Sequence, residues 1–455
     1  HNFRRDLTAN QSARTIIGYI YCSSAYGEST QDMVYAGSSL IYENGARLAE
    51  AERFKCEGSM IFADIDVEKL RTLRQKESTF GAVAPDGTDS SAFNPLYQIV
   101  EGLAAADTDF EKELLRPVEP HPFVPGGDEK EIDRRAREIT SIQVSGLATR
   151  LEHIKCSSAV IGISGGLDST LALLVTVMAF DKLGWPRRNI IGVTMPGFGT
   201  TDRTYNNAID LMASLGITIR EISIVPAVKQ PFSDIGHEID NHNVTYENSH
   251  ARERTQILMD IANQTNGLVV GTGDLSELAL GLATYNGDHM SMYGVNASIP
   301  KTLVKYLVRW AALNHFDISS TGGRSSKEIL LDIVDTPISP ELTPADENGN
   351  IAQKTEDLVG PYDLHDFFLY NFFRFGYCPS KIYFLARKAF EGEFDDKTIK
   401  KWLTKFYWRF FSQQFKRSCL PDGPKVGSVS LSPRGDWRMP SDATVALFIK
   451  DLDSI

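Results

Sequence analysis

The chain has 455 residues, of which 42% are hydrophobic, so it is long enough for two domains with sizeable cores. Acidic residues outnumber basic residues by 59 to 47, and the net charge of -12 argues against a nucleic-acid partner. The five cysteines form no C-x-x-C pair, which excludes the common zinc and thioredoxin spacings. The longest apolar run, 171–180, is far shorter than the roughly 20 residues that span a bilayer. We therefore expect a cytoplasmic protein with reduced cysteines and no membrane partner.

The first 84 residues favour β-structure. Apolar runs at 15–21 and 59–67 predict two strands, and residues 33–51 predict a hairpin around the turn Glu43-Asn44-Gly45-Ala46. These strands are too few to close a domain by themselves. Residues 85–130 are rich in Pro, Gly, Asp and Ala, which is typical of a connector with little core of its own.

Strand and helix patterns alternate along most of residues 131–455. The spacing of apolar residues predicts strands at 159–163, 190–195, 217–224 and 267–271. It predicts helices at 132–154, 168–183, 203–215 and 252–264. Such alternation is typical of parallel βαβ units, so the expected fold class is α/β with a doubly wound parallel sheet.

The string Ser164-Gly165-Gly166-Leu167-Asp168-Ser169-Thr170 joins the first of these strands to a helix. Its two glycines let the backbone approach an anion, and the helix adds its positive amino end. The string has no lysine, so it is not a Walker P-loop. Asp168 would repel phosphate unless a cation lay between them, which predicts bound Mg²⁺. The alternative is an ordinary turn in which Asp168 caps the helix.

Two further segments carry charged residues near predicted helix starts. Glu277 follows the strand at 267–271 and lies in the first turn of the next helix, within reach of the same metal. Lys301 follows Pro300 in the first turn of a helix, where the helix dipole disfavours a cation. Its position therefore suggests a neighbouring phosphate. The alternatives are an ordinary helix-start acid for Glu277 and a solvated surface lysine for Lys301.

Several long strings, in the same order, resemble NAD synthetases of the N-type ATP pyrophosphatase superfamily. They are Ile161–Thr170, Gly271–Gly281, Asn296–Thr302 and Asp335–Leu342, followed by the tail strings Gln414–Ser418, Gly423–Lys425 and Leu431–Arg438. The tail is similar to the glutamine-dependent branch. The resemblance implies that the nicotinate carboxylate of deamido-NAD attacks the α-phosphate of ATP and releases pyrophosphate. Ammonia then converts the acyl-adenylate to the amide, giving NAD and AMP.

The resemblance also implies roles for individual residues. It makes Asp168, Glu277 and Lys301 catalytic, with Mg²⁺ bound by Asp168 and Glu277. The positions that match ATP-binding residues are Gly162, Ile163, Ser164, Gly165, Gly166, Leu167, Asp168, Ser169, Thr272, Lys301 and Ser339. The positions that match deamido-NAD-binding residues are Asn248, Arg254, Glu277, Leu282, Ala283, Thr284, Tyr285, Asp288 and Lys416. For two of them there are ordinary alternatives, a helix cap for Asn248 and a surface helix charge for Arg254.

Residues 1–84 resemble the last part of a nitrilase-fold glutaminase, at strings 12–14, 27–30, 43–45 and 50–54. That family uses a Glu, a Lys and a Cys, which all lie upstream of Arg4-Arg5-Asp6-Leu7 and so outside this chain. Neither Cys22 nor Cys56 is expected to be the nucleophile. The resemblance implies that the intact protein takes ammonia from glutamine and is a homo-oligomer.

Other assignments stay open at this point. One is another amidating or thiolating member of the superfamily, such as GMP synthetase or a tRNA-modifying ligase. A second is a nitrilase-type amidase whose ligase domain is only a scaffold. A third is a regulatory module that binds ATP without releasing pyrophosphate.

Overall fold

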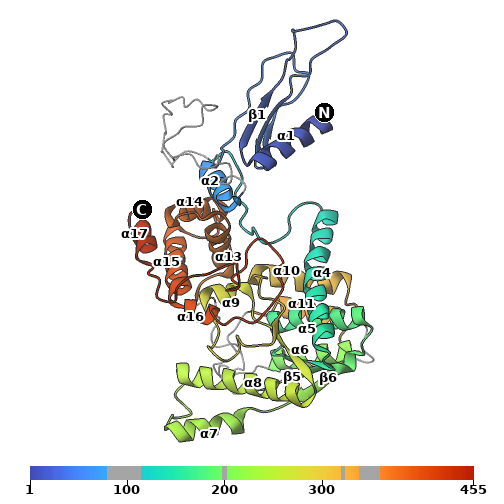
Figure 1. Ribbon diagram of the computed structural model, residues 1–455, viewed down its shortest axis with the longest axis vertical. Coiled ribbons are helices and arrows are strands. Elements are labelled where there is room, and N and C mark those ends of the chain that lie inside the picture. The colour runs from blue at the N-terminus through green and yellow to red at the C-terminus, as the bar shows by residue number, and fades with distance from the viewer. Residues whose placement is uncertain (79–113, 197–201, 319–322, 338–355, 357–358) are drawn as a thin grey trace, which may run out of the picture. The chain divides into compact units, whose positions relative to one another are not determined.

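The computed structural model describes residues 1–78, 114–196, 202–318, 323–337, 356 and 359–455. The chain forms two compact units (Figure 1). Unit 1 comprises residues 1–119 and 371–389, and unit 2 comprises 120–370 and 390–455. Residues 371–389 thus belong to the same compact unit as residues 1–119. The predicted family modules, 1–84, 85–130 and 131–455, do not coincide with the compact units and stay predictions. Most of the predicted connector, 85–113, lies outside the described residues.

Unit 1 contains a three-stranded antiparallel sheet with the strand order β1-β2-β3. Its elements are α1 (Asn2–Thr15), β1 (Gly18–Cys22), β2 (Ser39–Glu43), β3 (Ala46–Glu50), α2 (Val67–Lys76), the π-helix η2 (Asn371–Phe375) and α14 (Pro379–Ala389). The predicted hairpin is confirmed, because β2 and β3 pair around Asn44 and Gly45, both with positive φ. The strand predicted at 59–67 is wrong. That segment is irregular until Asp66 caps α2.

A buried carboxylate, that of Glu43, binds three different segments of unit 1. Glu43 is fully buried at the end of β2 and accepts hydrogen bonds from Lys69 Nζ and Arg116 Nη1, both at 2.8 Å. It also accepts from the backbone N–H of Asp66 at 2.6 Å. Burial opposes ionisation, yet these donors hold the pKa of Glu43 below its ordinary value. The carboxylate therefore joins β2 to α2 and to the segment after residue 113.

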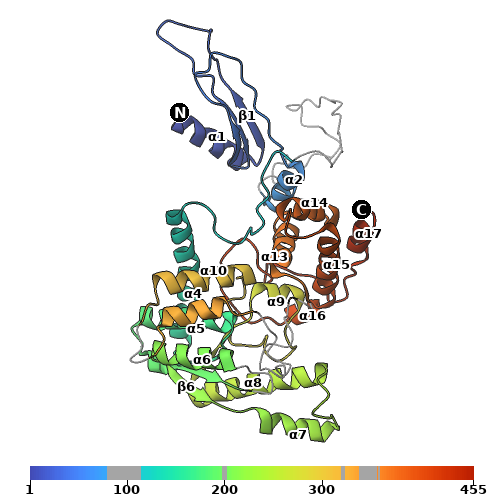
Figure 2. The same cartoon turned by 180° about the vertical axis from the view of Figure 1, so that it is seen from behind.

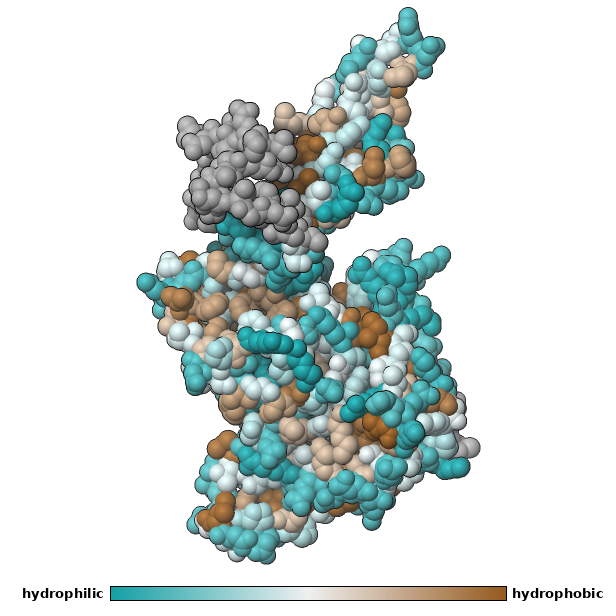
Figure 3. Space-filling model, viewed as in Figure 1, coloured by the Kyte–Doolittle hydropathy of each residue, from teal (hydrophilic) through white to brown (hydrophobic). Residues whose placement is uncertain are grey.

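Several apolar side chains of unit 1 are exposed, and brown groups lie among hydrophilic ones on the face that Figure 3 shows. The members that are at least 58% exposed are Phe3, Leu7, Ile20, Tyr26, Met33, Val34, Phe54, Met60, Phe62 and Val67.

Unit 2 contains a five-stranded parallel sheet with the strand order β6-β5-β4-β7-β8. The strands are β4 (Ser158–Gly162), β5 (Ile190–Thr194), β6 (Thr218–Glu221), β7 (Gly267–Gly271) and β8 (Tyr293–Gly294). The chain starts at the central strand, proceeds outward through β5 and β6, and returns to β7 on the other side of β4. This order confirms the predicted doubly wound α/β fold, and it places the reversal of direction between β4 and β7.

Helices cover both faces of this sheet, as Figures 1 and 2 show. One face packs against α4 (Glu129–Ile154), α5 (Leu167–Leu183), α6 (Asp202–Leu215), α10 (Lys301–Asn314) and α11 (Ser326–Val334). The other packs against α7 (Val225–Ile235) and α8 (Val244–Gln264). Successive strand residues alternate between the two cores, Ile161 in the first and Val160 in the second. Burial on both faces explains why β4, β5 and β7 are largely apolar, whereas β6, at the edge of the sheet, is mostly exposed and has the sequence Thr-Ile-Arg-Glu.

The remaining helices of unit 2 lie beyond the carboxyl ends of the strands (Figure 1). They are α9 (Leu275–Leu280), α13 (Tyr362–Tyr370), α15 (Asp396–Ser412), α16 (Gln414–Arg417) and α17 (Ala446–Asp453), and a short 3₁₀ turn, η1 (Arg187–Asn189), precedes β5. Aromatic rings of α13 and α15, including Phe368 and Phe406, pack against each other. Among the described residues, no helix has both the length and the apolar character needed to cross a bilayer.

His365 on α13 provides a test of this packing by pH. Its ring is buried and donates from Nε2 to the Val359 carbonyl at 2.6 Å, and burial lowers the pKa of His365 to about 4. Between pH 6.5 and 4 the unfolded chain therefore binds a proton that the folded chain does not bind. Between pH 7.5 and 5, which crosses the upper part of this window, we expect the free energy of unfolding to fall by about 2 kcal/mol on account of His365. Denaturant titrations of the wild type and His365→Gln at pH 7.5 and 5 measure this, and equal pH dependence would contradict it.

Candidate active site

Two strand ends meet where the strand order reverses. The string Ser164–Ser169 follows β4, and the segment Thr272–Asp274 follows β7. Because β4 and β7 are paired and parallel, both segments lie at the same edge of the sheet. Asn296 joins them, since its Nδ2 donates to the carbonyl oxygens of Asp168 at 3.0 Å and Thr272 at 3.1 Å. Sequence reasoning included Asn296 in a matching string but gave it no role.

The loop after β4 has the shape expected of an anion cradle. Gly165 has a φ of 92°, and a Cβ atom at this position would collide with the backbone of Thr204. The backbone N–H of Gly166 donates to Ser164 Oγ at 3.2 Å, and that hydroxyl lies 3.3 Å from Ser169 Oγ. Gly166 is the N-cap of α5 and has no side chain to bind the first N–H groups of the helix. These N–H groups can therefore bind an anion.

Asp168, Glu277 and Lys301, the three residues predicted to be catalytic, lie together in unit 2. Lys301 Nζ is 2.6 Å from Asp168 Oδ2 and 3.0 Å from Glu277 Oε1. It is also 2.6 Å from Asp274 Oδ2, a neighbour that the sequence did not predict. Lys301 is only 3% exposed, so the alternative of a solvated surface lysine is wrong. Asp274 also caps α9 by accepting from the Glu277 N–H at 2.8 Å. In the sequence it stands in the matching string Gly271–Gly281, which gave it no separate role.

Burial and the neighbouring charges shift the pKa values of three residues in this cluster. Burial alone would lower the pKa of Lys301, but the three carboxylates raise it well above its ordinary value. Burial raises the pKa of Asp274 well above its ordinary value, and it raises that of Glu277 to about 7 although Lys301 opposes both shifts. Lys301 carries one positive charge, whereas the three acids carry up to three negative charges when they are ionised. A divalent cation would offset the difference.

The same acids suit a divalent cation in geometry. Asp168, Asp274 and Glu277 each offer a carboxylate oxygen, and these oxygens lie within 4.8 Å of one another. Asp168 Oδ1 is buried and has no hydrogen-bond partner among the described residues. Oxygen donors of this kind are the ligands that Mg²⁺ prefers. The residues present therefore fit the predicted cation.

Most of the residues predicted to bind deamido-NAD also lie together. Thr284 donates from Oγ1 to Asn248 Oδ1 at 2.8 Å and from its backbone N–H to Asp288 Oδ1 at 2.6 Å. Lys416 Nζ donates to the Ala283 carbonyl at 2.6 Å. Residues from α8, from the segment after α9 and from α16 thus form one connected group. The alternative for Asn248, a helix cap, is wrong because Asn243 caps α8.

The other predicted positions are less closely joined to this group. Leu282 follows Gly281, the C-cap of α9, and its N–H donates to the Glu277 carbonyl at 2.9 Å. The Tyr285 ring is 46% exposed and packs on His289. Arg254 is half-buried further along α8 and makes none of the hydrogen bonds named above. Ser339 lies outside the described residues.

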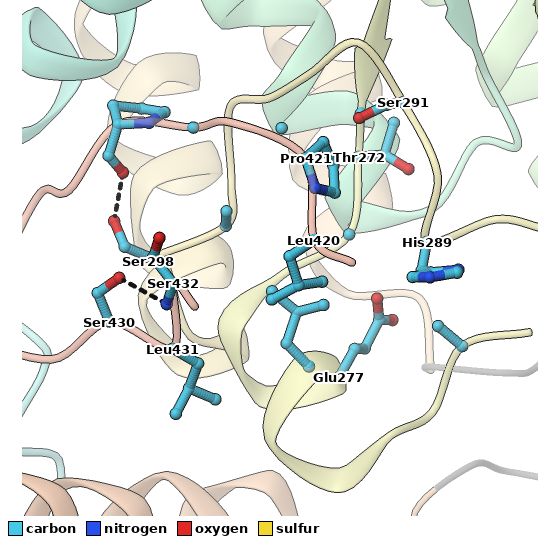
Figure 4. A pocket seen from close by; sticks show the side chains of 18 of the residues that line it. Thr272, Glu277, His289, Ser291, Ser298, Leu420, Pro421, Ser430, Leu431 and Ser432 are labelled. Atoms are coloured by element: carbon cyan, nitrogen blue, oxygen red, sulfur yellow. Dashed lines mark hydrogen bonds between the residues drawn. The ribbon is translucent and has the colours of Figure 1, made fainter. Parts of the chain in front are cut away.

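A pocket opens beside Glu277 (Figure 4). Thr272, Glu277 and His289 lie on one side, Ser298 and tail residues 430–432 lie on the other, and tail residues Leu420 and Pro421 lie between them. The tail is held by backbone contacts, including the bond from Ser298 Oγ to the Pro424 carbonyl at 2.8 Å. The tail strings matched the glutamine-dependent branch in sequence, but nothing in them indicated that they form a wall of this pocket.

The NAD synthase family model matches residues 139–317, which contain the loop after β4, Glu277 and Lys301. The glutamine-dependent NAD(+) synthetase of Mycobacterium tuberculosis strain H37Rv is 42% identical over 475 residues, covering 99% of this chain and 68% of that protein. The chain belongs to the glutamine-dependent NAD(+) synthetase family. Its counterpart in Mycobacterium leprae is 41% identical over 473 residues, with the same two coverages.

A solved glutamine-dependent NAD(+) synthetase from Cytophaga hutchinsonii has the same fold. Its TM-score is 0.57 at 18% identity, and the match covers 100% of this chain and 67% of that one. Family membership confirms the resemblance inferred from the sequence strings. It also removes GMP synthetase and the tRNA-modifying ligases as assignments for this NAD synthetase relative.

Gly165 gives a direct test of the loop. We expect Gly165→Ala to abolish detectable ATP binding and to destabilise the chain, because the added methyl group displaces the loop from Thr204. Gly184→Ala is the matched control, since Gly184 also has positive φ, at the end of α5, but has open space around it. The control should lose only the roughly 1–2 kcal/mol that a left-handed conformation costs a non-glycine residue. Calorimetric ATP titration and denaturant unfolding measure both effects. Equal behaviour of the two variants would show that the loop does not depend on this close approach.

Proposed function

We propose that this protein amidates deamido-NAD to NAD at the expense of ATP, through an adenylate, with AMP and pyrophosphate as the other products. In the intact protein, glutamine would supply the ammonia. The observation that carries this proposal is the Lys301 ammonium group, held between Asp168 and Glu277 at the carboxyl ends of β4 and β7. Membership of the glutamine-dependent NAD(+) synthetase family supports it.

The loop after β4 would hold the ATP phosphates. The amino end of α5 offers backbone N–H groups, and Ser164 and Ser169 add hydroxyl donors. Asp168 and Glu277 would bind Mg²⁺, with Asp274 beside them, and the cation would neutralise phosphate charge. Thr272 lies on the adjoining strand end, where it can contact the same nucleotide.

In the first step, an oxygen of the nicotinate carboxylate attacks the α-phosphorus of ATP, and the bond to the pyrophosphate oxygen breaks. Both reactants are anions, so the step needs positive charge near the α-phosphate. Lys301 remains protonated at neutral pH because the carboxylates raise its pKa. Its ammonium group would stabilise the charge that develops on the phosphate oxygens.

In the second step, ammonia attacks the acyl carbon, and the bond to the AMP oxygen breaks. The group formed by Asn248, Thr284, Asp288 and Lys416 would hold deamido-NAD with its acyl carbon near Glu277. Arg254 and Tyr285 belong to the proposed binding surface through the family resemblance. A homo-oligomeric and cytoplasmic protein is part of the same proposal.

The nitrogen source tests the proposal. We expect a protein of these 455 residues to form AMP and NAD from ATP, Mg²⁺, deamido-NAD and ammonium. Glutamine should not replace ammonium, because the residues that resemble a glutaminase do not include its nucleophile. Chromatographic measurement of AMP and NAD decides the matter. Absence of AMP with either source would contradict the synthetase assignment, and turnover with glutamine would contradict the account of residues 1–84.

Substitution of Lys301 tests its proposed role. Lys301→Met removes the ammonium group but keeps an apolar stem of similar length, so we expect kcat/KM for ATP to fall at least about a hundredfold, as for other lost electrostatic stabilisers. Lys305→Met is the control, since Lys305 lies one turn along the same helix and is exposed. The control should change kcat/KM less than about twofold. Circular dichroism checks that both variants fold, and similar kinetics for the two would contradict the role of Lys301.

A further inference from the structure

The helix that carries Lys301 has no local cap at its amino end. The N-cap residue of α10 is Pro300, which has no side-chain donor or acceptor for this purpose. The first N–H groups of an α-helix have no partner inside the helix. Here they bind side chains from two other helices. The N–H of Lys301 donates to Ser276 Oγ on α9 at 2.8 Å, and the N–H of Thr302 donates to Asp366 Oδ2 on α13 at 3.0 Å.

Asp366 is the centre of this arrangement. Its side chain is almost completely buried, and both of its oxygens accept hydrogen bonds. Oδ1 accepts a short bond from Ser276 Oγ, and Oδ2 accepts from Thr302 Oγ1 at 2.7 Å in addition to the Thr302 N–H. A carboxylate at the amino end of a helix is favoured by the helix dipole. It also offsets the unfavourable position of the Lys301 cation in the first turn.

These bonds connect the acids of the site to its lysine. Ser276 lies between Asp274 and Glu277 in sequence, so any movement of Ser276 also moves the two acids on α9. The same hydroxyl fixes the backbone of Lys301. The side chain of α13 residue Tyr362 adds a further contact, because its ring centre is 5.3 Å from Lys301 Nζ. The distance from Lys301 Nζ to Glu277 therefore depends on α13 as well as on α9 and α10.

We propose that Asp366 is a positioning residue, which acts through Ser276 and Thr302 to hold the Lys301 ammonium group against Asp168 and Glu277 for adenylation. This inference rests on the proposed function. Asp366 has no described contact with the loop that would hold ATP, so its effect on the reaction is indirect. The opposing view is that Asp366 caps α10 for stability alone.

The test compares Asp366→Asn and Ser276→Ala with a variant that weakens the other end of α10. Asp133→Asn is that control, because Asp133 Oδ1 accepts from Trp310 Nε1 at 3.0 Å near the end of α10, far from Lys301 in the helix. For each full-length protein we would measure kcat and KM with ammonium as nitrogen source, the number of ATP sites by calorimetry, and the melting temperature. Expressing kcat per ATP site removes the effect of unfolded molecules.

We expect Asp366→Asn and Ser276→Ala to lower kcat per site at least tenfold while KM for deamido-NAD changes less than threefold. Asp133→Asn should keep kcat per site within twofold whatever its melting temperature. If kcat falls only in proportion to the number of ATP sites, kcat per site is unchanged and the positioning role is overturned. Equal kcat per site in the wild type and the three variants is the same contradicting result. A wild-type protein without turnover would instead contradict the proposed function, and the positioning role would fall with it.

Thr302 supplies a second test if Asp366→Asn does not fold. Thr302→Val removes one donor to Asp366 and keeps the backbone N–H, so kcat per site should fall about threefold to tenfold. Thr302→Ser retains the hydroxyl and should restore kcat per site to within twofold of the wild type. Equal kcat per site for the Val and Ser variants would overturn the inference, because a hydroxyl that acts through Asp366 must distinguish them.

Discussion

The burial of Lys301 among three carboxylates is the interaction on which the rest of unit 2 depends. Burying an ammonium group costs desolvation free energy unless acids surround it in a suitable geometry. Removing one partner of such a cluster leaves a buried charge without compensation. Lys301 meets Asp168, Asp274 and Glu277 within 3.0 Å. These residues come from three separate helix starts. The fold must therefore bring the amino ends of α5, α9 and α10 to one point.

The parallel sheet achieves this through its strand order. The chain leaves β4 in one direction and returns at β7, so the two strand ends that lead into α5 and α9 are neighbours. Asn296 then fixes the spacing of the two loops by binding a carbonyl from each. The tail after α16 closes the site from another side and lines the pocket beside Glu277. Residues as far apart in the sequence as Gly271 and Arg434 thus line one pocket.

The sequence predicted those parts of the site that depend on local order. A strand, a Gly-Gly turn and a helix start are contiguous in residues 159–170, and a strand, a short loop with Gly273 and a helix start are contiguous in residues 267–277. Lys301 was predicted from its unfavourable place in a helix dipole, although the neighbouring anions in the structure are carboxylates. Asp366 could not be predicted in this way, because its side chain accepts a hydrogen bond from the amino end of α10, which begins 65 residues earlier in the chain.

The errors in unit 1 also have physical reasons. The segment 59–67 contains Met60, Ile61 and Phe62, an apolar run that resembles a strand but is largely exposed and unpaired in the sheet. α1 was missed because its residues are mostly polar, so no apolar stripe marked it. The hairpin at Asn44 and Gly45 was predictable because those two residues favour the positive φ angles that the turn requires.

An oxygen-18 transfer experiment tests the central claim most directly. Deamido-NAD labelled in both oxygens of the nicotinate carboxylate is converted with unlabelled ATP and ammonium, and the products are analysed by mass spectrometry. If the carboxylate attacks the α-phosphate, one labelled oxygen bridges the adenylate and leaves with AMP. We predict AMP with one oxygen-18 atom, unlabelled pyrophosphate and one label in the amide of NAD. Unlabelled AMP, or label in pyrophosphate or inorganic phosphate, would contradict adenylation at this site.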